Sequence, residues 1–389
     1  MTRVLLAPDK FKGTLTAAEV AGHVARGLQS VAREAGVSLT VEVVPVADGG
    51  DGTLAAAEAA SFELVPITAT GPTGHPVTAA WARRGDEAVV ELAAVSALAL
   101  LAPDALAPLT ATSRGTGELV RAALDAGCRR VVLGIGGSAC TDGGAGLAAS
   151  LGARVRGADG AEVADGGAAL WGAATLDLEA LHPALGGDEP AEVVVACDVD
   201  NPLTGPRGAA TVYGPQKGAS PQDVAVLDTA LGHWADLVAA TTGTDHRDDP
   251  GAGAAGGVGF AAVALLGARL EPGVDLVFGL TGFHDALARL GPGDLVVTGE
   301  GSLDDQTLHG KAPAGVAKAA HAKGIRVVAV AGRCLLDDAA LRTAHLDGTY
   351  ALTDLSSDER ELFGRPGPLL EELGRRVARD HLTTTGENL

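Results

Sequence analysis

Short apolar runs alternate along the chain with alanine-rich stretches in which apolar residues recur every three or four positions. The runs are rich in Val, Ile and Leu and bounded by Gly, Asp or Pro, which is typical of buried strands, whereas the recurring spacing predicts helices. Strands are predicted over 3–7, 39–45, 87–91, 130–134, 192–197, 294–298 and 326–331, and helices over 16–35, 53–60, 116–126, 143–151, 221–241 and 313–323. This alternation predicts an α/β protein with parallel strands.

Two of these helices carry a start signal. Thr16 is followed three residues later by Glu19, which is a capping box, and Ser220 with Asp223 is its weaker aspartate form. We therefore expect helices to begin directly after Thr16 and Ser220.

The length of 389 residues allows two domains of ordinary size. The first segment and the last hundred residues show the same order of elements: a strand, a turn with Gly, Asp and Lys, and then a helix. We therefore predict one discontinuous, Rossmann-like α/β domain over 1–68 and 285–389, with a second α/β domain inserted over 69–284. The Pro/Gly-rich segment 68–75 and the segment 279–284 are the candidate connectors.

Composition narrows the class of protein. Hydrophobic residues make up 47% and aromatic residues 3%, which predicts a largely aliphatic core. The net charge of −20 argues against nucleic acid and anionic membranes as partners. Four separated cysteines, no signal-peptide pattern and no apolar run of about 18 residues predict a cytoplasmic protein with free thiols.

Glycine-rich turns that carry charged residues lie at or near the ends of predicted strands. They read APDKFKGT (7–14), ADGGDGT (47–53), GIGGSACTDGGAG (134–146), CDVDNPLTGPRG (197–208) followed by GPQKG (214–218), and GEGSLDDQTLHGK (299–311). Ligands of parallel α/β sheets bind at the carboxyl ends of strands, where glycine lets backbone N–H groups approach an anion. Carboxylates beside phosphate imply Mg²⁺ between them. The turns therefore predict a metal–nucleotide site.

Lysine is scarce, with six residues against 23 arginines, and four of the six lie in these turns: Lys10, Lys12, Lys217 and Lys311. A lysine ammonium is a compact point charge that binds phosphate and is not interchangeable with arginine. The distribution favours a phosphate-binding role for these lysines over a generic surface charge.

Most of the familiar sequence motifs of nucleotide-binding and catalytic sites are absent. Lys311 is followed by Ala312, so there is no P-loop, and the protein-kinase motifs, GxSxG and HExxH are absent. Gly134–Ala139 matches a dinucleotide fingerprint after a strand, which keeps an NAD-dependent hydroxyacid oxidoreductase as an alternative, although Asp142 in the same turn opposes a pyrophosphate. Cys140 has no visible base partner and is expected to be a packed thiol.

Taken in order, the turns resemble the bacterial glycerate kinase family. The resemblance rests on seven motifs: APDKFKGTLTAAEV, PVADGGDGT, GIGGSACTDGGAG, ACDVDNPLTGPRGAATVYGPQKGA, PGAGAAGGVGFA, LVVTGEGSLDDQTLHGKAP and VVAVAGR. Two small departures occur, since Lys10 stands where the family usually has Ser and Asp51 where Glu is common.

The resemblance implies the glycerate kinase I fold, with the active site in a cleft between two α/β domains. It implies phosphorylation of D-glycerate by ATP with Mg²⁺, and 2-phosphoglycerate as the product. The oligomeric state stays open, a homo-oligomer included. A non-catalytic glycerate sensor is the second alternative.

We assign roles to individual residues of these turns as a hypothesis. Asp198, Lys217 and Lys12 are assigned to catalysis, with Asp198 or Asp200 as base. The expected substrate residues are Asp48, Gly49, Gly50, Asn201 and Lys311; the nucleotide residues are Gly136, Gly137, Ser138 and Asp142; the metal ligands are Asp198, Asp200, Glu300 and Asp304. The competing interpretation for Asp48, Asp142 and Asp200 is loop capping through Asx turns.

Overall fold

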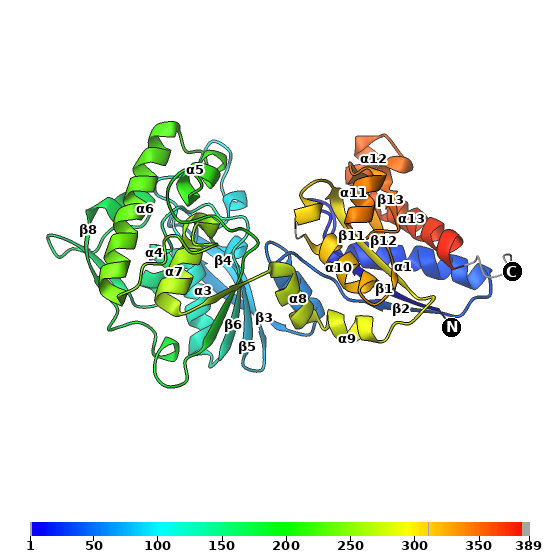
Figure 1. The fold of residues 1–389 in the computed structure, drawn as a ribbon, viewed down its shortest axis with the longest axis horizontal. Helices are drawn as coiled ribbons and strands as arrows, with labels where there is room; N and C mark the ends of the chain where they lie inside the picture. Colours follow the sequence, from blue (N-terminus) through cyan, green and yellow to red (C-terminus); the bar gives the residue numbers. More distant parts are fainter. Residues whose placement is uncertain (1, 310, 383–389) are drawn as a thin grey trace. The chain divides into compact units, whose positions relative to one another are not determined.

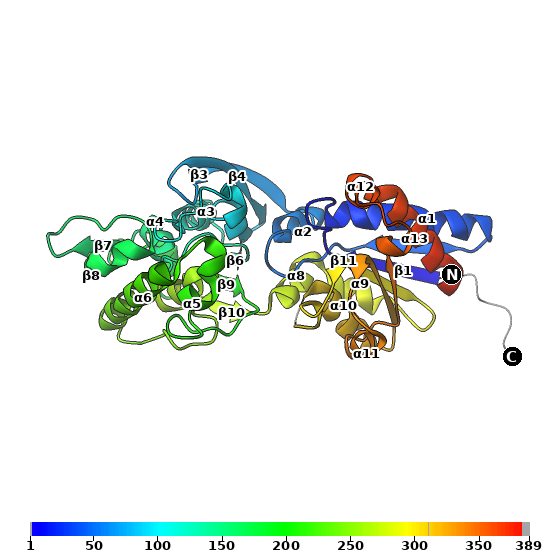
Figure 2. The ribbon, with the colours of Figure 1, turned by 90° about the horizontal axis from the view of Figure 1, so that it is seen from above.

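The computed structural model describes residues 2–309 and 311–382, and this part of the chain divides into two compact units (Figures 1 and 2). Unit 1 comprises the chain up to Asp48, Ala55–Ser61 and the chain from Val274 onward. Unit 2 comprises Gly49–Leu54 and Phe62–Gly273. The predicted domain boundaries at 68/69 and 284/285 stay predictions.

Unit 1 is built on a parallel sheet in the strand order β13-β12-β11-β1-β2. Its strands are β1 (Thr2–Pro8), β2 (Leu39–Val43), β11 (Leu295–Leu303), β12 (Arg326–Cys334) and β13 (Gly348–Ala351). Both faces of β1 are covered: Val4 and Leu6 pack with α1 (Ala17–Glu34) and α13 (Pro366–His381), while Leu5 and Ala7 pack with α10 (Ala312–His321). This double coverage explains why β1 is an unbroken apolar run in the sequence.

Unit 2 contains a mixed sheet in the order β10-β9-β6-β5-β4-β3, in which β10, β9, β6 and β5 are parallel. Its strands are β3 (Glu63–Thr70), β4 (Pro76–Arg84), β5 (Glu87–Glu91), β6 (Arg130–Gly134), β9 (Glu192–Ala196) and β10 (Arg269–Glu271), and a separate two-stranded sheet pairs β7 (Arg154–Gly157) with β8 (Ala173–Asp177). Residues 68–70 end β3, residues 71–75 form a turn, and β4 begins at Pro76, so the segment 68–75 lies in an antiparallel hairpin, and its role as a domain connector stays a prediction.

The remaining helices are α2 (Thr53–Ala59), α3 (Arg114–Asp125), α4 (Ala145–Ser150), α5 (Ala209–Tyr213), α6 (Pro221–Thr242), α7 (Val258–Leu266), α8 (Gly273–Thr281), α9 (Phe283–Ala288), α11 (Asp338–Thr343) and α12 (Glu359–Gly364). Both predicted capping boxes are present: the backbone N–H of Glu19 donates to Thr16, and that of Asp223 donates to Ser220. The predicted strands and helices are confirmed to within three residues, except that β11 continues through Leu303 into the segment predicted as a turn.

Helices α1 and α13 lie side by side, as Figures 1 and 2 both show, and their backbones meet at Gly27. A Cβ added at Gly27 would fall 2.1 Å from the carbonyl oxygen of Glu371, so Gly27→Ala should push the helices apart and destabilise the protein by about 1–3 kcal/mol. Gly22→Ala on α1 is the control: its Cβ would meet only the end of the Arg26 side chain at 3.7 Å, and helix propensity should make it neutral or stabilising. Urea unfolding compares them; equal stability of the two variants would contradict this packing.

Candidate active site

The carboxyl ends of β1 and β11 place interacting carboxylates in unit 1. Asp9 directly follows β1, and its backbone N–H donates to the carbonyl of Gly299 over 2.7 Å, beside Glu300. The Asp9 side chain is buried, and its Oδ1 accepts from the backbone N–H of Lys10 over 2.6 Å. Burial raises the pKa of Asp9 to about 7, and the negative charge of Asp48 acts in the same direction. A carboxyl group that titrates near neutral pH can accept or release a proton there.

Sequence analysis did not include Asp9. The signal was present, because Asp9 is the first polar residue after the apolar run of β1, at the edge where ligands of parallel sheets bind. Of the lysines in the same turn, Lys12 is exposed and Lys10 is half-buried.

Glu300, in the carboxyl-terminal part of β11, lies close to Asp304 and Lys311 of the segment that follows the strand. One carboxylate oxygen of Glu300 accepts from the Thr307 hydroxyl, and the other lies 3.4 Å from Nζ of Lys311. The same Nζ lies 4.0 Å from Oδ1 of Asp304. Burial raises the pKa of Glu300, while the Thr307 hydroxyl and the Lys311 charge oppose that shift. The end of β11 and the segment after it therefore place two carboxylates around one ammonium group.

In unit 2, the turn at Gly49 and Gly50 packs directly on the turn after β6. A Cβ added at Gly134 would fall 2.5 Å from the Gly49 carbonyl oxygen, and one added at Gly136 would fall 2.8 Å from Cα of Gly50. Gly49 itself has a φ of +83° and also approaches Ala196, at the end of β9. Only glycine permits this closeness of backbones. Two turns that the sequence separates by more than eighty residues thus form one glycine-lined surface.

The loop after β9 carries three predicted residues with different surroundings. Asp198 is exposed, and its Oδ1 accepts from the backbone N–H of Gly273 over 3.0 Å. Asp200 is also exposed and accepts from Arg207 over 2.8 Å. The Asn201 amide donates to the carbonyl of Arg207 over 2.8 Å, which ties the loop to itself. Asp200 and Asn201 thus both contact Arg207 within the loop, whereas Asp198 contacts backbone outside it.

Asp142 is 1% exposed and lies inside the turn. Its carboxylate accepts from the backbone N–H of Ser113 (2.8 Å), from the Ser113 hydroxyl (2.9 Å), and from the backbone N–H groups of Gly144 (3.1 Å) and Gly146 (3.3 Å). Burial raises the pKa of Asp142, and these donors oppose the shift. With so many donors, the carboxylate ties the loop before α4 to the segment before α3.

Lys217 is 2% exposed, at the end of the short 3₁₀ turn Pro215–Lys217. Its Nζ donates to the Ser138 hydroxyl over 2.9 Å and to the Cys140 carbonyl over 2.6 Å. Burial lowers the pKa of Lys217, and the nearby acidic group of Asp142 opposes the shift. Lys217 thus stabilises the turn 136–142, which is predicted to bind the nucleotide, through its contacts with Ser138 and Cys140 on the buried side of the turn. Burial also raises the pKa of the Cys140 thiol, which keeps it protonated and packed.

Comparisons with known proteins bear on the whole chain. The model of the glycerate kinase family matches residues 4–382. The chain is 41% identical to a glycerate kinase of Bacillus subtilis over 97% of both proteins, and 40% identical to a glycerate 2-kinase of Escherichia coli over 90% of both. This chain belongs to the glycerate kinase family. A crystal structure of a candidate glycerate kinase 2 from Salmonella typhimurium LT2 shares 39% identity and a TM-score of 0.84, covering 97% of this chain and 98% of that one.

For this member of the glycerate kinase family, the structural match confirms the predicted α/β class with parallel sheets. Within residues 2–309 and 311–382, no helix has the length and hydropathy needed to cross a membrane. Over the same ranges, no three or more His, Cys, Asp or Glu side chains cluster in a way that could hold a metal ion. The four cysteines are free thiols.

Proposed function

We propose that this chain transfers the γ-phosphoryl group of ATP to the 2-hydroxyl of D-glycerate, giving 2-phosphoglycerate and ADP. The single observation that carries the proposal is the match to the glycerate kinase family from residue 4 to residue 382. The relative from Escherichia coli, named a glycerate 2-kinase, supports the 2-position. The cytoplasmic location and the oligomeric state stay predictions.

We propose that the nucleotide phosphates lie against the backbone of Gly136, Gly137 and Ser138. This turn combines closely packed glycine backbone with a buried lysine beneath it, which suits an anion. Asp142 and Lys217 then act mainly by holding the turn in shape. This differs from the assignment of Lys217 to catalysis that the sequence suggested, because the buried ammonium group is already bonded to Ser138 and Cys140.

For the acceptor, we propose that Asp48, Gly49, Gly50, Asn201 and Lys311 bind glycerate. Lys12 and Lys311 supply positive charge for the glycerate carboxylate and for phosphate oxygens, which a chain of net charge −20 must provide locally. Lys12 is exposed and so can reach a ligand without breaking a buried contact.

Mg²⁺ fits the residues present. It prefers oxygen ligands and is commonly held by one or two carboxylates together with substrate phosphates, so a site of three protein carboxylates is not required. Asp198 and Asp200 are exposed carboxylates on one loop, where Asp200 pairs with Arg207, and Glu300 and Asp304 share Lys311. We propose Asp198 and Asp200 as one pair of Mg²⁺ ligands. Glu300 and Asp304 are proposed as a second pair. When bound, Mg²⁺ would neutralise charge on the phosphate oxygens.

The reaction needs one proton acceptor. The oxygen of the glycerate 2-hydroxyl attacks the γ-phosphorus, the bond from that phosphorus to the bridging oxygen breaks, and ADP leaves while a carboxylate takes the hydroxyl proton. Asp198 is one candidate base. We add Asp9, because it is buried at a strand end and has a pKa near neutral pH. An acid of ordinary pKa is a weaker base for this step.

Purified protein should release ADP only when D-glycerate, ATP and Mg²⁺ are all present, and EDTA should abolish the release. A coupled assay for ADP measures this. Nicotinamide absorbance changes without ADP would indicate the oxidoreductase alternative, and glycerate binding without ADP would indicate a sensor. Either result would overturn the proposed function.

A further inference from the structure

We propose that Arg333 binds the carboxylate group of the acceptor substrate and so helps to determine which acceptors the protein accepts. This inference rests on the proposed function, which makes D-glycerate the acceptor. Arg333 ends the sequence motif VVAVAGR and lies in the carboxyl-terminal part of β12, one residue before the end of that strand. Ligands of parallel α/β sheets bind at this edge of the sheet.

A serine hydroxyl orients the guanidinium group of Arg333. The parallel register places Arg333 opposite Ser302 of β11, and its Nε–H group donates to the Ser302 hydroxyl over 3.1 Å. The same hydroxyl donates to Oδ2 of Asp304 over 3.2 Å. Arg333 is therefore linked through one hydroxyl to a carboxylate that is itself a proposed metal ligand.

The backbone around Arg333 is closely packed. A Cβ added at Gly332 would fall 2.4 Å from the carbonyl oxygen of Gly301, so the ends of β12 and β11 approach as only glycine allows. On the other side, a Cβ added at Gly301 would lie 3.5 Å from the backbone nitrogen of Lys12. The backbone of Arg333 is thus held in place, and its exposed side chain can meet a ligand.

The positive charge of Arg333 is not already neutralised by a carboxylate. Within residues 2–309 and 311–382 its side chain forms no ion pair, and its one hydrogen bond is to the neutral Ser302 hydroxyl. That bond uses Nε, so both Nη groups stay available to donate to the two oxygens of a carboxylate. Lys311 differs, because its Nζ lies 3.4 Å from Glu300 and 4.0 Å from Asp304.

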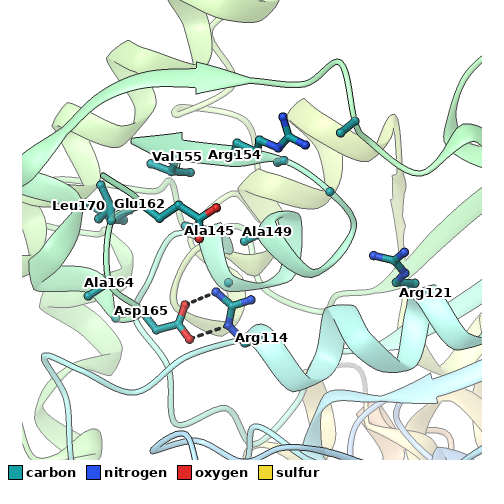
Figure 3. A pocket seen from close by; sticks show the side chains of 16 residues that line it. Arg114, Arg121, Ala145, Ala149, Arg154, Val155, Glu162, Ala164, Asp165 and Leu170 are labelled. Atoms are coloured by element: carbon teal, nitrogen blue, oxygen red, sulfur yellow. Dashed lines mark hydrogen bonds and ion pairs between the residues drawn. The ribbon is translucent and has the colours of Figure 1, made fainter. Parts of the chain in front are cut away.

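A cavity of unit 2 shows the contrasting case, in which arginines are already paired (Figure 3). The cavity has a volume of about 360 Å³, and three arginines line it. Each forms an ion pair with a carboxylate: Arg114 with Asp165, Arg121 with Asp125, and Arg154 with Asp177. Those charges are balanced within the protein, whereas the charge of Arg333 is balanced only when an anion binds.

The chemistry of the acceptor explains why a cation is needed beside β11. D-Glycerate carries hydroxyl groups and a carboxylate. The carboxylates of Asp9, Glu300 and Asp304 at this edge of unit 1 can accept hydrogen bonds from the hydroxyl groups, but they repel the substrate carboxylate. The planar guanidinium group of Arg333 matches both oxygens of a carboxylate, which a lysine ammonium does not. Arg333 therefore selects hydroxy acids over neutral polyols.

Steady-state kinetics of Arg333→Gln test this contact. Glutamine loses the charge and the paired donors, so KM for D-glycerate should rise about 10- to 100-fold, the loss expected for hydrogen bonds between charged groups. KM for ATP should stay unchanged, because the nucleotide phosphates are proposed to lie on the turn of unit 2. An unchanged KM for D-glycerate would overturn the proposal. An equal rise in KM for ATP would also overturn it, since Arg333 would then contact the nucleotide.

Three matched variants check the geometry. Arg333→Lys keeps the charge without the paired donors and should raise KM for D-glycerate less than Arg333→Gln does. Ser302→Ala removes the acceptor that orients Nε and should raise it severalfold. Arg342→Gln changes an exposed arginine of α11 and should leave both KM values unchanged. Urea unfolding of Arg333→Gln should match that of the unaltered protein, which would exclude a merely structural role.

Isothermal titration with D-glycerate separates failure of this inference from failure of the proposed function, because it needs no turnover. If the unaltered protein forms no ADP, the proposed function fails. Weaker binding of D-glycerate by Arg333→Gln than by the unaltered protein would still support the contact. Equal binding by the two proteins, or no binding by either, would overturn it.

Discussion

Replacing Asp9 with Asn is expected to make the protein more stable at pH 8 and far less active. Asp9 is buried, and burial together with the charge of Asp48 raises the pKa of its carboxyl group from 3.8 to about 7. The ionised form therefore opposes folding. Asparagine has nearly the same shape and cannot ionise, so it removes this cost. Gain of stability with loss of activity is typical of a strained functional group.

The effect has a defined pH window. Below about pH 4 the carboxyl group is protonated in both the folded and the unfolded protein, so the variant gains nothing. As the pH rises from about 4 to about 7, the unfolded state loses the proton first, and the folded protein loses stability. Above about pH 7 the full cost is present, on the order of 4 kcal/mol at about 1.4 kcal/mol per pKa unit. Urea unfolding in metal-free buffer at pH 4 and pH 8 measures the difference.

Activity provides the second half of this test. A general base contributes about 10²- to 10⁴-fold, so kcat of Asp9→Asn should fall by that factor. The kcat/KM of the unaltered protein should rise with pH through about 7, where Asp9 loses its proton, and the variant should lack that rise. Glu58→Gln, at an exposed position on α2, is the control and should change neither property. A variant that is less stable at pH 8, or that keeps kcat within threefold, would contradict the role of Asp9.

Lys217→Met is expected to have the other large effect, on stability and on ATP binding together. Methionine fills similar space but leaves the Ser138 hydroxyl and the Cys140 carbonyl without their donor. It also removes the positive charge beside buried Asp142. Breaking one partner of a buried charged group costs about 3–5 kcal/mol. Because Lys217 holds the turn, KM for ATP should rise more than kcat falls. Thermal unfolding and steady-state kinetics measure the two effects.

Two further variants test whether these effects are specific to Lys217 and its hydrogen bonds. Lys323→Met replaces an exposed lysine and should leave stability and kinetics unchanged. Ser138→Ala removes one acceptor of Lys217 and should cost about 1 kcal/mol, with a smaller rise in KM for ATP. A fall in kcat of Lys217→Met with normal stability and normal KM would show instead that Lys217 touches the transferred phosphoryl group.

The sequence predicts the strands and helices well because local patterns decide them. The run at 4–6 is continuously apolar since both faces of β1 are covered, and the capping box at Thr16 begins α1 where expected. The β3–β4 hairpin was missed for a related reason. Its turn, TGPTGH, has the composition of a connector, and only the antiparallel pairing of Glu63 with Arg83 and of the residues between them reveals a hairpin.

The site is less predictable, because burial depends on residues far along the chain. Asp142 is surrounded by donors from Ser113, 29 residues earlier, and Lys217 reaches Ser138, 79 residues away. A turn motif names these side chains but does not say whether they point at a ligand or into the protein. Asp9 shows the converse, since its raised pKa requires burial and the approach of Asp48 from another strand end.

Phosphorus NMR of the reaction mixture tests the central claim most directly. After incubation of the purified protein with D-glycerate, ATP and Mg²⁺, the γ-phosphate signal should be replaced by a new phosphate ester signal. Phosphorus on the secondary 2-oxygen couples to a single proton, so the proton-coupled signal should be a doublet. A triplet would place the phosphoryl group on the 3-oxygen, and the absence of any new ester signal would contradict the assignment of this chain as a glycerate kinase.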